Sequence, residues 1–249
     1  MNENEQFLTP SERLKNIMEK IRKYKCVDVK SLSKEYYINE ATIRRDLNKL
    51  ANTGLVQRTY GGAVLVEGLD AEIPLYARES SNVEKKELIG KLASMQVHDD
   101  DTIILDSSST TLKIINHLIG KKNLKIITNG AKTATLLSKL TDCTIYCTGG
   151  KLRENSLSFI GQTAVDYIRN FYVDIAFFSC RSLSAQKGLT DANEDEAMLR
   201  RAMIESAKKS ILLIDSTKLN TVSFFSICPI DKIDKIICDI SLPEELKLR

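Results

Sequence analysis

Residues 42–47 read Thr-Ile-Arg-Arg-Asp-Leu, within a stretch whose apolar residues recur at helical spacing. Ile43, Leu47 and Leu50 predict one buried face of a helix that spans residues 40 to about 52. The polar side chains that point away from this face are Thr42, Arg44, Arg45, Asn48 and Lys49. A recognition helix in the DNA major groove needs this combination of an apolar face and a face rich in hydrogen-bond donors.

Two further helices are predicted before this one. Thr9-Pro10-Ser11-Glu12 is a helix start, with Thr9 as N-cap, and an apolar stripe continues that helix to about residue 24. Asp28 is placed to cap a second helix that reaches about Tyr36, after a short break, and Asn39 is placed to cap the third. Three helices in this order predict a helix-turn-helix.

A hairpin is predicted directly after the third helix. Residues 55–60 and 63–66 read as two strands, and Gly61-Gly62 joins them. A hairpin at this position makes the unit a winged helix. We expect Arg58, Gly61 and Gly62 to lie at the DNA surface together with the polar face of the third helix.

The charge distribution supports this reading. Residues 1–62 hold 12 Lys and Arg against 8 Asp and Glu, a net charge of +4, whereas residues 63–249 hold 24 against 25, a net charge of −1. A small basic module in front of a near-neutral one is expected if only the first meets a polyanion. On spacing alone, an ordinary interaction domain with solvated arginines remains an alternative.

The boundary between the two modules is predicted near residue 70. Residues 67–74 have no periodicity and contain both Gly and Pro. We therefore divide the chain into a DNA-binding domain at 1–66, a linker at 67–78 and a second domain at 79–249.

The second domain is predicted to be a mostly parallel α/β sheet covered on both faces, because apolar runs alternate with helical segments. Asn82 is placed to cap its first helix. The predicted strands are 102–106, 124–128, 144–148, 173–179, 210–215 and 235–238. The other predicted helices are 111–119, 131–140, 162–170 and 193–208.

Polar residues follow four of these strands. In a parallel α/β sheet, ligands bind beyond the carboxyl ends of the strands. The residues at those ends are Asp106, Ser107, Ser108, Ser109, Thr110, Thr111, Asn129, Gly149, Gly150, Lys151, Arg153 and Lys218. Taken singly, these are a helix cap, a turn and a surface lysine, but together they predict a site for a phosphorylated small molecule.

Both modules resemble the DeoR family of bacterial transcription regulators. The resemblance is carried by the hexapeptide 42–47, the Arg-x-x-Gly-Gly-Ala wing at 58–63 and the Asp-Ser-x-x-Thr-Thr loop at 106–111. Further matches are Thr128-Asn129, Gly149-Gly150, Gly161, Gly188-Leu189-Thr190, Glu196, Arg200 to Met203 and Asp215 to Lys218.

The resemblance implies a function as well as a fold. It implies a second domain like ribose-phosphate isomerases, and a repressor, or less often an activator, of sugar or polyol metabolism genes whose DNA affinity a phosphorylated sugar controls. Arg153 and Arg200 are then weaker candidates for the phosphate. Three serines stand where the family has glycine, namely Ser108, Ser179 and Ser182, and Arg181 is a cation where the family is small or neutral.

Two other function classes compete with this one. A sugar-phosphate isomerase carrying a DNA-binding domain would need a carboxylate base, and Asp106, Glu196 and Lys218 could be assigned such roles. No separate acid–base pair stands at motif spacing, so we expect a regulator with no catalytic residue. An architectural DNA-binding protein without an effector is the third class.

The rest of the composition argues against a metal site, a disulfide framework, a membrane span and a secretory signal. Six scattered cysteines and two histidines give no metal or disulfide pattern, so we expect neither metal nor cofactor. No apolar run reaches 18 residues and residues 1–6 are not those of a secretory signal, so we expect a cytoplasmic protein without a membrane partner. We expect at least a homodimer on double-stranded operator DNA, because one winged helix buries little DNA surface.

Overall fold

The computed structural model describes residues 9–51, 56–65, 75–79, 81–140 and 142–247. The chain divides into two compact units, Met1–Ser81 and Asn82–Arg249.

The first unit contains the three predicted helices, α1 (Pro10–Tyr24), α2 (Val29–Tyr36) and α3 (Glu40–Ala51). Thr9 and Glu12 form the predicted capping box at the start of α1, and Asp28 accepts a hydrogen bond from the Ser31 amide at 2.8 Å. Asn39 accepts one from the Thr42 amide at 2.8 Å. The predicted starts of all three helices are thus confirmed.

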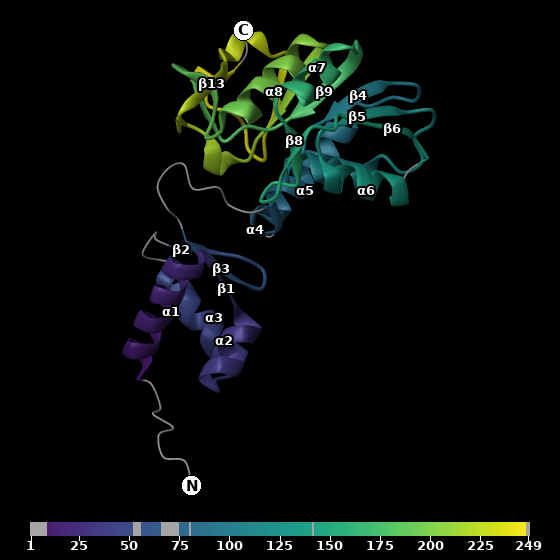
Figure 1. The fold of residues 1–249 in the computed structure, drawn as a ribbon. Helices are drawn as coiled ribbons and strands as arrows, with labels where there is room; N and C mark the ends of the chain where they lie inside the picture. Colours follow the sequence, from purple (N-terminus) through teal and green to yellow (C-terminus); the bar gives the residue numbers. More distant parts are fainter. Residues whose placement is uncertain (1–8, 52–55, 66–74, 80, 141, 248–249) are drawn as a thin grey trace. The chain divides into compact units, whose positions relative to one another are not determined.

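A three-stranded antiparallel sheet completes the first unit, in the order β1-β3-β2. Its strands are β1 (Cys26–Asp28), β2 (Val56–Arg58) and β3 (Gly62–Leu65). The hairpin of β2 and β3 was predicted, whereas β1 was read as a break between helices and that reading was wrong. Figure 1 shows the three helices gathered on one side of this sheet.

Gly62 has a structural role that the hairpin prediction did not include. Neither glycine of the Gly61-Gly62 pair has a positive φ, so the turn does not depend on that freedom. A Cβ at Gly62 would lie 1.8 Å from the Val27 carbonyl oxygen, because β1 passes directly beside it. Gly62 therefore allows β1 and β3 to pair.

The second unit is built on a six-stranded, fully parallel sheet in the order β14-β12-β9-β4-β5-β6. Its strands are β4 (Thr102–Leu105), β5 (Lys125–Thr128), β6 (Thr144–Cys147), β9 (Val173–Phe178), β12 (Ala207–Leu213) and β14 (Lys235–Ile237). Each of the six predicted strands corresponds to one of these, and the predicted parallel sheet is confirmed.

Helices cover the sheet on both faces, as expected (Figure 1). Alternate strand residues such as Ile104, Ala176 and Leu212 are buried in one cluster with α7 and α8 residues. α5 packs against β12 and β14. The helices are α5 (Val83–Ser94), α6 (Ala131–Leu140), α7 (Gln162–Arg169), α8 (Glu194–Glu205) and the 3-10 helix η1 (Thr111–His117).

Several short elements were not predicted. In the first unit, α4 (Leu75–Glu79) begins inside the range read as a linker, 67–78, and ends one residue beyond it. The second unit also contains a hairpin of β7 (Lys151–Arg153) and β8 (Ser158–Ile160), and a small sheet of β10 (Ser182–Ser184), β11 (Gly188–Asp191) and β13 (Phe225–Cys228). Short 3-10 turns follow β12, β13 and β14, and they are η2 (Ser216–Lys218), η3 (Ile230–Lys232) and η4 (Glu244–Leu246).

Candidate functional sites

The exposed face of α3 carries the side chains predicted for DNA. Ile43 and Leu47 are fully buried, whereas Arg44, Arg45, Asn48 and Lys49 are exposed and Thr42 is half-buried. Arg44 forms an ion pair with Glu40 one turn earlier, at 2.7 Å. The face is therefore polar and basic, with donors that can reach base edges and phosphates.

Asp46 is the exception within the hexapeptide. Its side chain is 3% exposed, and its Oδ2 accepts a hydrogen bond from Arg13 Nε at 2.6 Å. This buried pair fastens α3 to α1. Asp46 thus has a structural role, which the helical spacing alone did not distinguish.

Arg58 connects the wing to α3. Its Nε donates to Asn48 Oδ1 at 2.7 Å, and its guanidinium also donates to the Gly62 carbonyl. Burial, with a smaller effect from Arg44, lowers the pKa of Arg58. At the turn of the wing, Tyr60 is 91% exposed and Gly61 is exposed, whereas Gly62 is buried.

The candidate effector site lies where the strand order of the large sheet reverses. From β4 the chain continues outward through β5 and β6, and then returns to β9 on the other side of β4. Ligands bind beyond the carboxyl ends of strands at such a switch point. Asp106 follows β4 and Ser179 follows β9, and the Ser179 amide donates to Asp106 Oδ2 at 3.0 Å.

Asp106 organises the loop that follows β4. Its Oδ1 accepts from the Ser108 amide at 2.9 Å and from Thr111 Oγ1 at 2.7 Å. Ser108 Oγ in turn lies 3.2 Å from the Thr111 amide, which donates to it. All six residues from Asp106 to Thr111 are buried.

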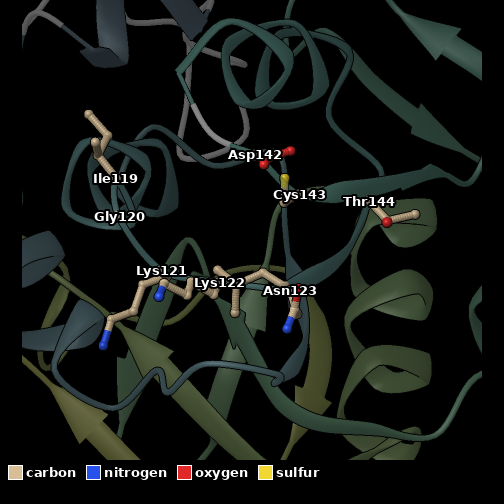
Figure 2. Close-up of a pocket in the computed structure, with 9 residues that line it drawn as sticks. Ile119, Gly120, Lys121, Lys122, Asn123, Asp142, Cys143 and Thr144 are labelled. Atoms are coloured by element: carbon tan, nitrogen blue, oxygen red, sulfur yellow. The ribbon is translucent and has the colours of Figure 1, made fainter.

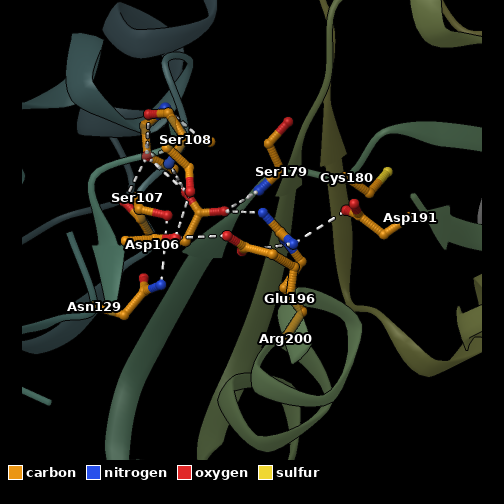
Figure 3. Close-up of polar contacts among 12 residues, drawn as sticks. Asp106, Ser107, Ser108, Asn129, Ser179, Cys180, Asp191, Glu196 and Arg200 are labelled. Carbon is orange, nitrogen blue, oxygen red and sulfur yellow. Dashed lines mark hydrogen bonds and ion pairs between the residues drawn. The ribbon is translucent and has the colours of Figure 1, made fainter. Parts of the chain in front are cut away.

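Arg200 of α8 lies among three carboxylates at the same place (Figure 3). Its guanidinium lies 3.5 Å from Asp106 Oδ2, 3.1 Å from Asp191 Oδ2 and 3.1 Å from Glu196 Oε2. Burial lowers the pKa of Arg200, but the three carboxylates outweigh burial and the net shift is upward. Arg200 is therefore a fixed cation whose charge the protein itself already balances.

Arg153 and the hairpin of β7 and β8 reach this cluster through Glu196. Ser158 Oγ donates to Glu196 Oε1 at 2.7 Å, and Arg153 lies 3.7 Å from the same oxygen. The hairpin also pairs with the end of β5, since the Phe159 amide donates to the Asn129 carbonyl at 2.7 Å. These contacts bring three distant segments of the sequence to one place.

Four buried polar atoms around the cluster have no hydrogen-bond partner among the described residues. They are Thr110 Oγ1, Asn129 Oδ1, Thr133 Oγ1 and Arg200 Nε. Asn129 Nδ2 lies 3.4 Å from Ser107 Oγ, so its amide reaches the loop after β4. Buried polar groups are nearly always paired, and four orphans in one region fit the oxygen atoms of a ligand.

Lys218 reaches the site from η2. Its Nζ donates to Ser179 Oγ at 3.3 Å and to the Cys180 carbonyl at 3.0 Å. The Ser179 amide donates to Asp106, so Ser179 is the residue that links Lys218 to the Asp106 carboxylate. The cation predicted after β12 therefore contacts the segment after β9, which in turn contacts Asp106.

Of the residues after the third predicted strand, Gly149, Gly150 and Lys151 show no contact with this cluster among the described residues. Gly149 and Gly150 have φ of 62° and 104° and form the turn into β7, and Lys151 is exposed. Arg153 is the residue of that segment that reaches Glu196.

Five participants were not predicted as effector contacts. They are Ser158, Thr133, Ser179, Asp191 and Glu196. Ser179 could have been found, because it is the last residue of a predicted strand and follows the observed strand β9 directly. Ser158 and Asp191 follow no predicted parallel strand, and Thr133 lies inside a helix.

A separate cavity of about 710 Å³ opens at the opposite edge of the sheet (Figure 2). It is lined by residues just before β5 and β6, among them Lys121, Lys122, Asp142 and Cys143. Because β5 and β6 run parallel, these are the amino ends of the strands. The cavity is therefore distinct from the predicted site.

Comparison with known proteins agrees with both units. A family model described as a DeoR-like helix-turn-helix domain matches residues 13–68, and one described as a DeoR C-terminal sensor domain matches residues 81–240. The chain belongs to the DeoR family of transcriptional regulators.

Curated relatives match along nearly the whole chain. The uncharacterized regulator YulB of Bacillus subtilis is 35% identical over 93% of this chain and 90% of its own length. The repressor GlcR of the same species is 32% identical over 92% of this chain and 88% of its own length. The chain is accordingly a DNA-binding transcriptional regulator and not an enzyme.

Ribose 5-phosphate isomerase A from Methanocaldococcus jannaschii matches 56% of this chain and 55% of its own chain, with 18% identity and a TM-score of 0.41. In the part of the chain that the structure describes, no helix is long and apolar enough to cross a membrane.

Proposed function

We propose that this regulator is a repressor of sugar or polyol metabolism genes and that a phosphorylated sugar or polyol controls its affinity for operator DNA. Residues 1–66 bind DNA and residues 79–249 sense the effector, with 67–78 as the connection between them. The sensor-domain match supports a small-molecule effector, and the cluster around Asp106 supports its chemical class.

Two observations on the cluster around Asp106 support a phosphorylated sugar or polyol as the effector. The cluster contains both carboxylates and cations, and some of its buried polar atoms have no hydrogen-bond partner among the described residues. Asp106 and Asp191 offer carboxylate oxygens that accept hydrogen bonds from sugar hydroxyls. Lys218 and Arg153 offer cations for a phosphate. The free oxygen of Asn129 and the free hydroxyl of Thr110 suit further hydroxyl groups.

The DNA-binding part rests on α3 and the wing. We propose that Arg44 and Arg45 are the principal contacts, with Thr42, Asn48 and Arg58 beside them. Lys49, Gly61 and Gly62 belong to the same predicted surface, in which Gly62 acts through the backbone because it is buried.

We also propose that the chain binds DNA at least as a dimer. A single winged helix buries too little DNA surface for tight specific binding, and two half-sites one helical turn apart supply the rest. Light scattering at micromolar concentration should give a mass of at least twice 28.0 kDa. A mass of 28.0 kDa alone would contradict the dimer.

The effector class is tested on a DNA duplex selected from a random pool by the full-length chain. Its affinity is measured with ribose 5-phosphate, glucose 6-phosphate, fructose 1-phosphate and glycerol 3-phosphate, and with the same compounds lacking phosphate. One phosphorylated compound should weaken DNA binding by about 5- to 150-fold, and its unphosphorylated form should not.

Site variants connect that response to the cluster. Thr110→Val should bind DNA normally and lose the response, and Lys218→Met should lose the response whatever its starting affinity for DNA. Lys208→Met and Thr135→Val are matched controls, because both residues are exposed, Lys208 pairs with Asp174 and Thr135 lies on α6. Responses retained in the site variants, or lost equally in the controls, would refute the assignment of the site.

A further inference from the structure

The turn η2 is held by the candidate effector site on one side. Lys218 Nζ donates to Ser179 Oγ and to the Cys180 carbonyl, and the Ser179 amide donates to Asp106. Any anion that binds Lys218 must compete with these contacts. Effector binding therefore bears directly on the position of η2.

The first turn of α5 holds η2 on the other side. Asn82 occupies the N-cap position of α5 with a left-handed φ of 54°, and its side chain does not cap the helix as the sequence predicted. Instead Asn82 Nδ2 lies 3.3 Å from Asp215 Oδ1 and 3.3 Å from Thr217 Oγ1. An asparagine tolerates this backbone conformation and places its amide on the turn.

Lys85 strengthens the same attachment. Its Nζ donates to Ser216 Oγ at 2.6 Å and lies 3.4 Å from Asp239 Oδ2. Asp239 also accepts from the Ser216 amide at 2.6 Å. Burial raises the pKa of Asp239, but the hydrogen bonds from Ser216 and the charge of Lys85 outweigh burial, so the net shift is downward and the carboxylate stays charged.

Asn82 is also the first residue of the second compact unit, and Ser81 is the last residue of the first. Ser81 Oγ lies 3.4 Å from Gln57 Nε2, and Gln57 belongs to β2 of the wing. One peptide bond therefore separates a residue that contacts the wing from a residue that contacts η2.

We propose that η2 relays effector occupancy to the DNA-binding unit through Asn82 and Lys85. The proposal rests on the proposed function, since it assigns the route by which that effector acts. A phosphate on Lys218 weakens its bonds to Ser179 and Cys180 and shifts η2. Asn82 and Lys85 follow η2, and the shift reaches Ser81 through the backbone. Asn82 and Lys85 are positioning residues that need no contact with the ligand.

The first test needs no effector. Hydrogen exchange is measured by mass spectrometry on the full-length chain and on Lys218→Met. Releasing Lys218 should speed exchange in the first two turns of α5 several-fold, while the amides of α6 stay unchanged. Lys91→Gln is the control, because Lys91 is an exposed residue of α5, and it should leave the exchange of α5 unchanged. Unchanged exchange at the start of α5 in Lys218→Met would overturn the relay.

The second test uses the phosphorylated compound that weakens DNA binding by the wild-type chain most strongly, among the four named above. Asn82→Asp places a second carboxylate beside that of Asp215, so that repulsion replaces the hydrogen bond. Lys85→Gln removes the hydrogen bond from Lys85 to Ser216. Both variants should bind that compound with wild-type affinity by calorimetry. The factor by which it changes DNA affinity should fall toward one, whereas Lys91→Gln should keep the wild-type factor.

The outcomes separate the two proposals. If none of the four compounds binds the wild-type chain, the effector class is wrong, and the exchange measurement still decides the relay. If a compound binds and Asn82→Asp and Lys85→Gln keep the full wild-type factor, the relay is wrong while the effector class stands. If the two variants respond less because they bind the compound more weakly, the relay is also refuted. Asn82 and Lys85 would then belong to the binding site itself.

Discussion

Arg13 and Asp46 form a buried ion pair that joins α1 to α3, with Arg13 Nε 2.6 Å from Asp46 Oδ2. The two side chains are 8% and 3% exposed. The residue after Arg44-Arg45 is thereby fixed against the rest of the unit, which sets the direction of the exposed face of α3.

Arg13→Gln should destabilise the first unit strongly. Removing one partner of a buried pair leaves an uncompensated charge, at a cost of about 3–5 kcal/mol. Arg44→Gln breaks an exposed pair with Glu40 and should cost under about 0.5 kcal/mol. Native-state hydrogen exchange of α1 and α3 in the full-length chain measures both changes, and equal protection in the two variants would contradict the role of the buried pair.

The two glycines of the wing should respond differently to alanine. A Cβ at Gly62 would lie 1.8 Å from the Val27 carbonyl oxygen, so Gly62→Ala must push β1 and β3 apart, at a cost of about 1–3 kcal/mol. At Gly61 the nearest atom is an Asp28 carboxylate oxygen at 3.5 Å, an ordinary contact. Gly61→Ala should therefore leave the exchange of β1 and β3 near that of the wild type. A neutral Gly62→Ala would disprove this packing.

Arg45→Ala should weaken DNA binding in a way that salt reveals. If Arg45 contacts a phosphate, the slope of log affinity against log salt should fall by about one unit, for all sequences alike. If it reads a guanine, about 1–3 kcal/mol of discrimination should be lost at one base pair. Lys208→Ala, on the sensor unit, is the control. An Arg44→Ala/Arg45→Ala double variant with wild-type affinity and slope would exclude α3 as the contact surface.

Cys180 should be unreactive in the folded chain. Burial raises the pKa of the Cys180 thiol to about 12, and only the thiolate attacks alkylating reagents. At pH 8 the thiolate is then about one part in ten thousand of the total. Brief treatment with iodoacetamide followed by mass spectrometry should modify the exposed Cys26 and spare Cys180 until urea is added. Modification of both at equal rates in the native chain would contradict the buried environment.

Local periodicity predicted most of the fold. Ile43 and Leu47 are buried as the helical spacing requires, and the apolar runs that gave β4, β5 and β9 lie beside one another in the sheet. Short polar caps such as Thr9 also mark helix starts in the sequence itself. Apolar spacing and helix caps can be recognised in the sequence because each depends only on residues that are close together in the chain.

What the sequence did not predict depends on distant partners. β1 has only three residues, and apolar and polar side chains do not alternate along them. It is a strand because β3 pairs with it. Arg13 meets Asp46 across 33 positions, and Ser158 meets Glu196 across 38. The candidate site was therefore predicted where it follows strand ends, at Asp106 and Lys218. It was missed at Asp191, which tertiary packing alone brings to Arg200.

The central claim is that one ligand couples the cluster around Asp106 to DNA affinity, and calorimetry tests it most directly. The phosphorylated compound that releases the wild-type chain from its selected DNA is titrated into that chain, first alone and then saturated with the DNA. Linkage requires DNA to weaken the compound's binding by the same factor by which the compound weakens DNA binding, about 5- to 150-fold. The account predicts equal factors in the two directions, and an affinity for the compound that DNA leaves unchanged would contradict it.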